Sequence, residues 1–184
     1  MLLKRFNAPQ ITYRSVDTVT EESDAVDYSP ELLNSFNPPG FPQHMLTLKI
    51  GTPVILLRNI RPPELCNGTR LQVTFLGETF IRAVVFSGCG IGETFCLTRI
   101  PLTPNDGPLP FQRLHFPIRV CFAMTINKAQ GQTLRAAGVD LRQPCFSHGQ
   151  LYVAFSRVSS PKHLVVLQPD GCTRNVVYKE VFTS

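Results

Sequence analysis

A run of polar side chains in the second half of the chain directly follows an apolar stretch, and these side chains are of types that bind phosphate. The stretch Val120 to Met124 predicts a buried strand, and Thr125 is placed to cap a short helix after it. N–H groups at a helix N-terminus are unpaired and attract anions. The polar side chains of the next turn and a half are Asn127, Lys128, Gln130, Gln132 and Thr133, with Gly131 among them. The segment predicts a phosphate contact, although alone it also fits a polar surface loop.

A second candidate, Arg157, lies further along in the segment Gly149 to Val158. A guanidinium group binds phosphate through a forked and permanently charged set of donors. An arginine placed against a γ-phosphate in a transition state can be worth about 10³ to 10⁵ in rate. The alternative left open by the residue alone is a surface arginine or one that caps the C-terminus of a helix.

The elements expected to position these residues alternate between strand and helix. The patterns predict strands over 118–124, 138–141 and 163–167, and helices over 126–130 and 148–155. Ser147 and Gln150 have the spacing of a capping box at the start of the second helix. Alternation of this kind indicates α/β organisation with parallel strand pairing.

Residues 45–100 have a different character, because short strand patterns are separated there by turn residues. The candidate strands are 45–49, 54–58, 70–76, 80–87 and 94–99. Such close spacing predicts a small barrel or meander. The glycines of 88–92 lack the full spacing of a dinucleotide-binding loop and precede a strand, so they predict a hairpin turn.

The remaining segments flank this region. Ile11 to Val16 predicts a strand, and the acidic stretch Asp17 to Glu31 predicts a solvated loop. Ser29 and Pro30 indicate the start of a short helix that extends to Phe36. The segment 101–117 contains five prolines and is interpreted as a connector between folding units.

Charge and composition restrict the function classes. The net charge is +5; residues 1–109 contribute 9 − 10 = −1, and residues 110–184 contribute 9 − 3 = +6. A basic second part suits a nucleotide or a phosphate backbone, although charge for solubility explains it equally well. There is no apolar run near the length of a membrane span, and we expect no membrane partner.

The six cysteines show no C-x-x-C spacing and lie mostly in apolar runs. They predict buried, reduced thiols and therefore a reducing compartment. His148 and His163 lack an accompanying Asp, His or Cys cluster, so we expect capping or surface roles for them and no metal site.

Together the two polar segments resemble motifs V and VI of superfamily 1 DNA helicases. Their wording is most similar to the Pif-type (petite integration frequency) helicases and the related Helitron transposon helicases. The likeness extends to residues 48–59, 65–71 and 116–125 and covers roughly residues 12–168. It implies the fold class α/β plus small all-β: a partial RecA-like domain 2A, of the P-loop NTPase type, interrupted by a small Src-homology-3-like β-barrel, 2B.

The resemblance divides the chain into four parts and gives the candidate residues roles. Residues 1–44 and 118–184 would contribute to domain 2A, 45–100 would form the inserted barrel 2B, and 101–117 would be the connector. The implied DNA-binding residues are Thr125, Asn127 and Lys128, and the implied ATP-binding residues are Gln130, Gly131, Gln132 and Arg157, the last as the catalytic arginine finger. Asn127 stands where the family often has His. For Tyr152 a stacking role and a core role both stay open.

The family couples ATP hydrolysis to 5′-to-3′ movement on single-stranded DNA, with ATP and Mg²⁺ between two RecA-like domains. This sequence contains no G-x-x-x-x-G-K-[ST] loop and no Walker B strand. We therefore expect a C-terminal fragment of such a helicase that alone binds no cofactor tightly and is inactive. Its partners would be single-stranded DNA and the missing N-terminal RecA-like domain, from the same gene or a separate chain. The expected location is the nucleus, with mitochondria as a second compartment.

Two other readings compete with the helicase fragment. One is a single-stranded nucleic-acid-binding module without ATPase activity, in which the barrel and the basic second part bind the strand. The other is an interaction fragment left from a mobile element and bound to a partner protein.

Overall fold

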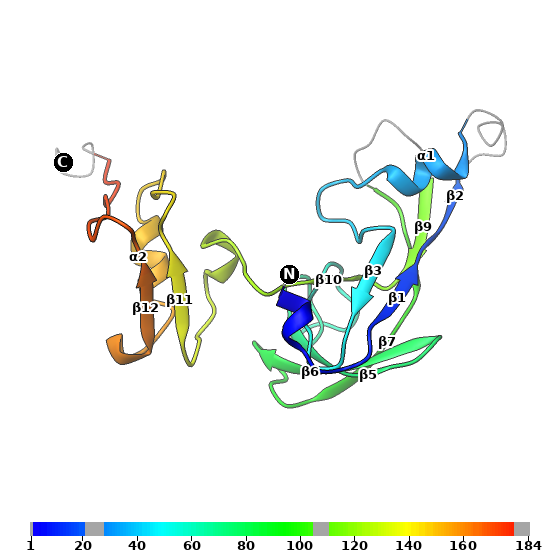
Figure 1. Cartoon of the computed structure of the whole chain (residues 1–184), viewed down its shortest axis with the longest axis horizontal. Coiled ribbons are helices and arrows are strands. Elements are labelled where there is room, and N and C mark those ends of the chain that lie inside the picture. The colour runs from blue at the N-terminus through cyan, green and yellow to red at the C-terminus, as the bar shows by residue number, and fades with distance from the viewer. Residues whose placement is uncertain (1, 21–27, 105–110, 179–184) are drawn as a thin grey trace. The chain divides into compact units, whose positions relative to one another are not determined.

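The computed structural model describes residues 2–20, 28–104 and 111–178. The chain divides into two compact units, Met1–Phe122 and Ala123–Ser184 (Figure 1). The elements of the chain are mostly short strands in small sheets, with few and short helices.

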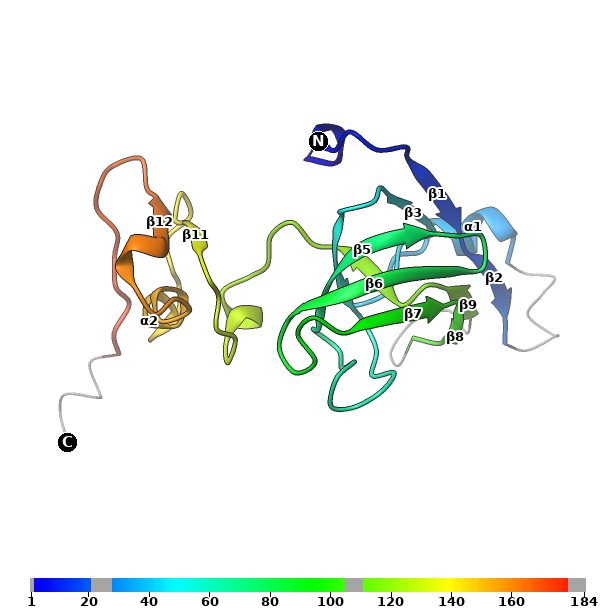
Figure 2. The same cartoon turned by 90° about the horizontal axis from the view of Figure 1, so that it is seen from below.

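The largest element of the first unit is a five-stranded antiparallel sheet, in which β5 and β6 form the long central hairpin (Figure 2). In sheet order its strands are β10 (Ile118–Val120), β4 (Pro53–Leu56), β5 (Arg70–Leu76), β6 (Phe80–Ser87) and β7 (Thr94–Thr98). The strand predictions for the last four are confirmed to within a few residues. The glycine-rich segment 88–92 connects β6 to its antiparallel neighbour β7, so the predicted hairpin is also confirmed.

The strand predicted over 118–124 is shorter and pairs elsewhere than expected. It ends at Val120, and it pairs antiparallel with β4 through Ile118 and Leu56. The expectation that it begins the parallel sheet of the C-terminal part was therefore wrong. An apolar run indicates a buried strand but does not identify the strand that it pairs with.

Two further small sheets complete the first unit. β1 (Ile11–Arg14) pairs with β3 (Met45–Leu48), and β9 (Phe111–His115) lies between β2 (Val16–Val19) and β8 (Ile100–Leu102), all antiparallel. A 3₁₀ helix, η1 (Leu2–Arg5), precedes them. The main core lies between the β1–β3 sheet and the five-stranded sheet, and its largest fully buried side chains include Leu48, Leu56, Leu71, Ile81, Leu97, Phe116 and Ile118. A second buried cluster contains Leu33, Phe41, Leu102 of β8 and Phe111 of β9.

The proline-rich segment 101–117 is more than a connector, which corrects the sequence interpretation. Most of β8 and all of β9 lie inside it. In β9 the residues Phe111, Arg113 and His115 alternate inward and are fully buried, while Leu114 is exposed. The interpretation relied on the five prolines, which are typical of connectors, and did not use this alternation.

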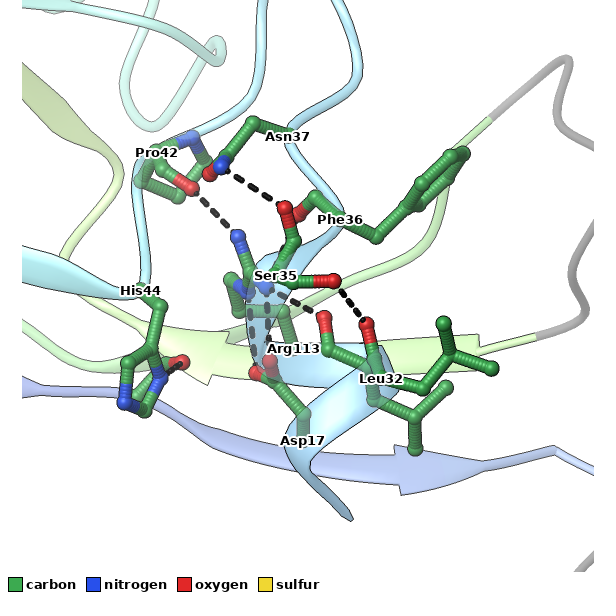
Figure 3. Close-up of polar contacts among 10 residues, drawn as sticks. Asp17, Leu32, Ser35, Phe36, Asn37, Pro42, His44 and Arg113 are labelled. Atoms are coloured by element: carbon green, nitrogen blue, oxygen red, sulfur yellow. Dashed lines mark hydrogen bonds and ion pairs between the residues drawn. The ribbon is translucent and has the colours of Figure 1, made fainter. Parts of the chain in front are cut away.

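A buried ion pair fixes β9 to the rest of the unit. The Nη2 of Arg113 lies 2.6 Å from Oδ2 of Asp17, and its Nε lies 2.9 Å from Oδ1 (Figure 3). Both side chains are almost completely removed from solvent. The prediction that Asp17 lies in a solvated loop was therefore wrong, whereas residues 21–27 of that loop lie outside the described part of the chain.

The short helix predicted after this loop is confirmed as α1 (Pro30–Ser35). Ser29 is its N-cap and accepts from the N–H of Leu32, and Pro30 occupies the first position. The C-terminal carbonyl groups of a helix have no partner within the helix. Here the guanidinium of Arg113 donates to the carbonyl oxygens of Leu33 and Phe36, both at 3.1 Å, and so ties α1 to β9.

In the second unit β11 (Ala137–Asp140) and β12 (Leu164–Leu167) pair in parallel, with α2 (Gln150–Phe155) between them in sequence. Parallel strand–helix–strand organisation is thus confirmed. The predicted capping box does not form, because Ser147 is not the N-cap and Oε1 of Gln150 accepts from the N–H of Phe146. Gly149 caps the helix instead, in the left-handed conformation at φ 69°. Two 3₁₀ helices, η3 (Asn127–Ala129) and η4 (Pro161–His163), complete the unit.

Three properties predicted from composition can be compared with the structure. None of the helices in the described ranges is long and apolar enough to cross a membrane. No cysteine forms a disulfide, but only Cys121 and Cys145 are buried, and Cys89, Cys96 and Cys172 are exposed, so the prediction of mostly buried thiols was wrong. Within residues 2–20, 28–104 and 111–178 no group of His, Cys, Asp and Glu side chains could hold a metal ion.

Candidate nucleotide and nucleic-acid site

The first polar segment folds into a single 3₁₀ turn instead of the helix predicted over 126–130. The turn is η3, and its formal N-cap is Ile126. Thr125 still accepts hydrogen bonds at the start of this turn. The N–H of Lys128 donates to its Oγ1 at 3.4 Å and to its carbonyl oxygen at 3.1 Å. One short turn has too few aligned peptides for a strong dipole, so the predicted phosphate contact would depend on the side chains.

The side chains proposed to contact DNA, Thr125, Asn127 and Lys128, are all exposed in the second unit. Ala129 is buried beneath them and anchors the turn. An exposed ammonium beside an exposed amide and hydroxyl can donate to phosphate oxygens without selecting a base.

The loop residues proposed to contact the nucleotide come directly after this turn in the sequence. Gly131 has φ +77°, and no atom lies within 4 Å of the position that a Cβ would occupy. Gln130 is exposed. Gln132 folds back so that its Nε2 donates to the carbonyl oxygen of Lys128 at 3.1 Å, while its Oε1 is buried and accepts no hydrogen bond from the residues that the structure describes. The loop thus combines open space at Gly131 with an unused acceptor at Gln132.

Arg157 joins this loop to the end of α2. Its Nε donates to the carbonyl oxygen of Val153 at 2.7 Å, and its Nη2 donates to Oγ of Ser156 at 2.8 Å. Its Nη1 reaches the loop and donates to the carbonyl oxygens of Ala129 at 3.3 Å and Gln132 at 3.1 Å.

The backbone adds a further link, because the N–H of Leu134 donates to the carbonyl oxygen of Arg157 at 2.8 Å. The two predicted segments are therefore in direct contact within one unit.

No carboxylate neutralises this guanidinium among the described contacts. Asp140, on β11, is instead held by Arg142, whose Nη2 lies 2.6 Å from its Oδ2. The hydrogen bonds from Arg142 lower the pKa of Asp140 to about 2, so this carboxylate is charged at neutral pH. The partners of Arg157 are carbonyl and hydroxyl dipoles, which leave its positive charge available to a phosphate.

The hydrogen-bond donors and acceptors at this site can be compared with what ATP and Mg²⁺ require. Arg157, Gly131 and Lys128 suit the phosphate end of a nucleotide, because they offer a fork, an open backbone and an ammonium. Magnesium prefers carboxylate and phosphate oxygens in octahedral geometry. The described part of the chain has no cluster of acids for it, so these residues suit the phosphate and not the metal.

Several aromatic side chains of the second unit are more exposed than the sequence indicated. Tyr152 on α2 is 74 % exposed, so a core role for it is wrong. Phe146 is exposed as well, and the rings of His148 and Tyr178 stack with centroids 5.2 Å apart. The helical period of α2 places Tyr152 on the face opposite the buried Ala154, which is a signal that could have been used.

Comparison with known proteins identifies the family. A family model described as "DNA helicase Pif1, 2B domain" matches residues 31–76. "ATP-dependent DNA helicase PIF1" of Homo sapiens is 34% identical over 149 residues, which is 80% of this chain and 23% of that protein. "ATP-dependent DNA helicase PIF6" of Trypanosoma brucei brucei is 34% identical over 131 residues, covering 67% of this chain and 16% of that protein. The chain therefore spans about a quarter or less of the length of these relatives.

Solved structures give the same result for the fold. The crystal structure of Pif1 helicase from Candida albicans matches with a TM-score of 0.69 and 25% identity, over 98% of this chain and 44% of that chain. A Bacteroides Pif1 helicase, solved in complex with ADP-AlF3 and ssDNA, matches with a TM-score of 0.64 and 19% identity, over 94% of this chain and 38% of that chain. The predicted fold class, small all-β together with a partial RecA-like α/β part, is confirmed. The family model, the relatives and the solved structures together place this chain in the Pif1-type helicase family.

Proposed function

We propose that this chain is the part of an ATP-dependent DNA helicase that supplies the nucleotide-sensing arginine and a contact to the DNA backbone, and that it lacks the P-loop domain. The observation that carries the proposal is the direct hydrogen bonding of Arg157 to the carbonyl oxygens of Ala129 and Gln132. Through it, any change at the phosphate end of a bound nucleotide reaches the loop that begins with the proposed DNA contacts. The relatives are named as ATP-dependent DNA helicases, which supports this class of activity.

In this proposal each residue of the site has a separate role. Arg157 exchanges some of its carbonyl partners for phosphate oxygens and stabilises the negative charge that moves during phosphoryl transfer. Gly131 lets the backbone approach the phosphate, and Gln130 and Gln132 donate or accept beside it. Bound Mg²⁺ would neutralise phosphate charge, held by the P-loop domain.

The proposed substrate is single-stranded DNA, bound by Thr125, Asn127 and Lys128 through its phosphates. One of the solved neighbours was crystallised with ssDNA, which supports this choice. Movement 5′-to-3′, a nuclear or mitochondrial location and the assignment of 45–100 to domain 2B are part of the same proposal.

The test supplies the missing part. The full chain is mixed with, or fused to, the P-loop-containing part of a Pif1-type relative, and DNA-stimulated ATP hydrolysis is measured. We expect the mixture to hydrolyse ATP and the chain alone not to. Arg157→Ala should abolish hydrolysis, while Arg174→Ala, an exposed arginine of the same unit, should not. Steady hydrolysis by the chain alone that Arg157→Ala removes would contradict the proposed division of labour.

A single-stranded nucleic-acid-binding module without ATPase activity is the alternative function. It is favoured by the four acceptors that Arg157 already has within its own unit, as a purely structural arginine would have. Lys128→Ala should weaken DNA binding and flatten its salt dependence under both functions. A failure of the supplied P-loop domain to restore hydrolysis, with DNA binding by the chain intact, would select the binding module.

A further inference from the structure

The strand β12 of the second unit is apolar on both faces and largely open to solvent. Val165, Val166 and Leu167 are 70%, 39% and 51% exposed, and Leu164 is half-buried. Parallel strands that are apolar on both faces normally lie inside a sheet, where both faces are covered. In the described part of the chain β12 instead pairs with β11 alone, in a two-stranded sheet (Figure 1). It has the composition of an interior strand and the position of an edge strand.

The outer edge of β12 has none of the features that protect the edges of sheets. Native proteins block exposed edges with charged side chains, prolines or bulges. β11, the other strand of this sheet, ends at Asp140, whose Oδ2 lies 2.6 Å from Nη2 of Arg142. β12 has the sequence Leu-Val-Val-Leu and contains no charged residue or proline. One strand of the sheet thus carries a charge at its edge and the other does not.

The hydrogen bonding of β12 defines which of its residues face this open edge. The N–H of Leu141 donates to the carbonyl oxygen of Leu167 at 2.9 Å, so the backbone of Leu167 faces β11. The backbone groups of successive residues in a strand point to opposite sides, so those of Val166 point outward. These outward groups have no strand partner among the residues that the structure describes. They are available to a further strand.

A second copy of the same strand fits this edge in antiparallel orientation. A two-fold axis perpendicular to a sheet keeps every side chain on its own face, so a symmetric pair has to be centred on one residue. With Val166 at the centre, its outward groups meet those of the second copy, and Val165 lies opposite Leu167 of that copy. The two most exposed side chains of β12 then cover each other. A centre at Val165 would place His163 opposite Leu167 and lose this contact.

The residues that flank β12 are complementary in the same register. Lys162 and Asp170 lie equally far from Val166 along the chain, one on each side. Both are exposed, and neither forms an ion pair within residues 2–20, 28–104 and 111–178. Pairing centred on Val166 brings Lys162 of each copy toward Asp170 of the other. Opposite charges in these positions favour this register and orientation.

We propose that β12 pairs antiparallel with β12 of a second copy of this chain, centred on Val166, and forms a four-stranded sheet across a symmetric dimer. Such a contact uses the open edge of both copies, so association stops at two chains. One short strand buries less than the standard interface of about 1,600 Å², so the dimer is weak and depends on concentration. The proposal goes beyond the proposed function, because it needs neither ATP nor DNA and uses none of the residues assigned to them.

The test is sedimentation equilibrium of the full chain over a wide range of concentrations, without nucleotide or DNA. We expect a monomer–dimer equilibrium without larger species. Val166→Lys places two ammonium groups against each other and should leave only monomer. Val165→Thr keeps the β-branched shape and should weaken the dimer on the order of tenfold, because each copy loses a methyl group from the contact. Val177→Thr, at an exposed valine of the same unit outside β12, should leave the dimer unchanged, and thermal melting checks that each variant is folded.

An exchange of charges tests the register. Lys162→Asp and Asp170→Lys should each weaken self-association on the order of tenfold, because like charges then face each other at both ends of the contact. An equal mixture of the two variants should regain the affinity of the unchanged chain, because both pairs are again opposite in charge in the mixed dimer. A mixture that stays as weak as each variant alone would overturn the register centred on Val166, and with it the proposal.

A disulfide cross-link tests the position of the two-fold axis. Hydrogen-bonded residues directly opposite in an antiparallel pair have Cα atoms about 5.5 Å apart, within the range of a disulfide. The background is the full chain with the exposed Cys89, Cys96 and Cys172 replaced by serine. On oxidation, Val166→Cys should form a covalent dimer, whereas Ser159→Cys, at an exposed residue outside β12, should not.

Hydrogen exchange of the Val166 N–H tests the edge without any substitution. We expect this N–H to be protected at high protein concentration and to exchange faster on dilution. A chain that is monomeric at every concentration, with this N–H protected throughout, would overturn the proposal and assign the edge to a segment of the same chain. A monomer in which this N–H always exchanges freely would overturn it as well and leave the edge to solvent.

Discussion

Arg157 donates through Nη1 to the carbonyl oxygen of Gln132 at 3.1 Å, so a side chain at the end of α2 restrains the loop that follows η3. The same nitrogen reaches Ala129, at 3.3 Å. An arginine that acts on a phosphate must have a fixed starting position and donors that can be exchanged. Here the Nε bond to Val153 within α2 fixes the side chain, and in the proposed function the Nη1 bonds to the loop are the ones exchanged for phosphate oxygens.

This geometry predicts how Arg157 variants behave without any nucleotide. Arg157→Ala removes the donors to Ala129 and Gln132 and should destabilise the second unit by about 1–3 kcal/mol, the range for leaving part-buried acceptors unpaired. Arg157→Lys keeps the charge but has no fork, so we expect an intermediate loss. Hydrogen exchange of the loop amides from Lys128 to Leu134 should accelerate in the same order.

Arg174→Ala is the matched control, because it removes an exposed guanidinium of the same unit. It should leave the exchange of these amides unchanged. If Arg157→Ala exchanged as slowly as the unchanged chain, the contacts to the loop would have no energetic weight, and the proposed communication between the two segments would fail.

A second prediction concerns Gly131. Its φ of +77° is a conformation in which side chains other than glycine, asparagine and aspartate are strained, but the space around it is open. Gly131→Ala should therefore cost about 1 kcal/mol through the backbone alone, and Gly131→Asn should cost less. The measurement is the urea midpoint of each variant.

Measuring nucleotide binding separates a role of Gly131 in the turn from a role at the phosphate. With the P-loop domain supplied, both variants should weaken ATP binding, because each places a side chain where the backbone approaches the phosphate. If Asn were tolerated as well as glycine in ATP binding, Gly131 would be needed for the turn and not for the nucleotide.

The sequence predicted those helices and strands that are specified by residues close to one another in the chain. The hairpin β5–β6 follows from alternation bounded by turn residues such as Gly77, and α1 follows from Ser29 and Pro30 at its start. Partners distant in sequence were not predictable. Asp17 and Arg113 are 96 residues apart, and neither side chain alone indicates that it is buried.

At the candidate site, too, local segments could be predicted but contacts between distant segments could not. The polar segment after Thr125 and the arginine at 157 were identified by residue type and by family resemblance, but their hydrogen bonds could not be derived from spacing. The exposure of Tyr152 was missed because an aromatic residue in a short apolar helix fits a core position equally well. The register of β5 against β6, which shifts between Val73 and Phe75, was not specified by the sequence.

A third prediction is a pH dependence that originates at His115. Burial, together with the nearby Arg99 and Arg113, lowers the pKa of His115 from 6.5 to about 4, and the opposing effect of Asp17 is smaller. Neither ring nitrogen has a hydrogen-bond partner among the described residues. Between these two pKa values the unfolded chain binds a proton that the folded chain does not, so the free energy of unfolding decreases as the pH falls from about 6.5 to 4.

The expected loss for His115 is roughly 3 kcal/mol at most, from 1.36 kcal/mol per pKa unit. Urea unfolding at a series of pH values measures it. His115→Leu removes the titrating group with little change of volume and should flatten this part of the profile. His163→Leu, at an exposed histidine of the second unit, should leave it as it is. An unchanged profile in His115→Leu would show that another group titrates.

The last prediction concerns the buried pair of Asp17 and Arg113. Asp17→Asn keeps the shape of the side chain but removes its charge, so the guanidinium stays buried without a counter-ion; the expected loss is about 3–5 kcal/mol. If the two charged groups contacted only each other, replacing both residues by apolar ones would recover most of that loss. Here Arg113 also donates to the carbonyl oxygens of Pro42, Leu33 and Phe36, which no apolar residue can satisfy (Figure 3).

The double variant Asp17→Leu, Arg113→Met should therefore remain less stable than the unchanged chain, by about 1–3 kcal/mol for each carbonyl that stays buried without a donor. A double-mutant cycle measured by urea unfolding gives both quantities, and Asp140→Asn, in the exposed pair with Arg142, is the control that should change little. Recovery of full stability in the double variant would mean that the carbonyl oxygens at the end of α1 find water when Arg113 is absent. Arg113 would then be a counter-ion to Asp17 and not the residue that ties α1 to β9.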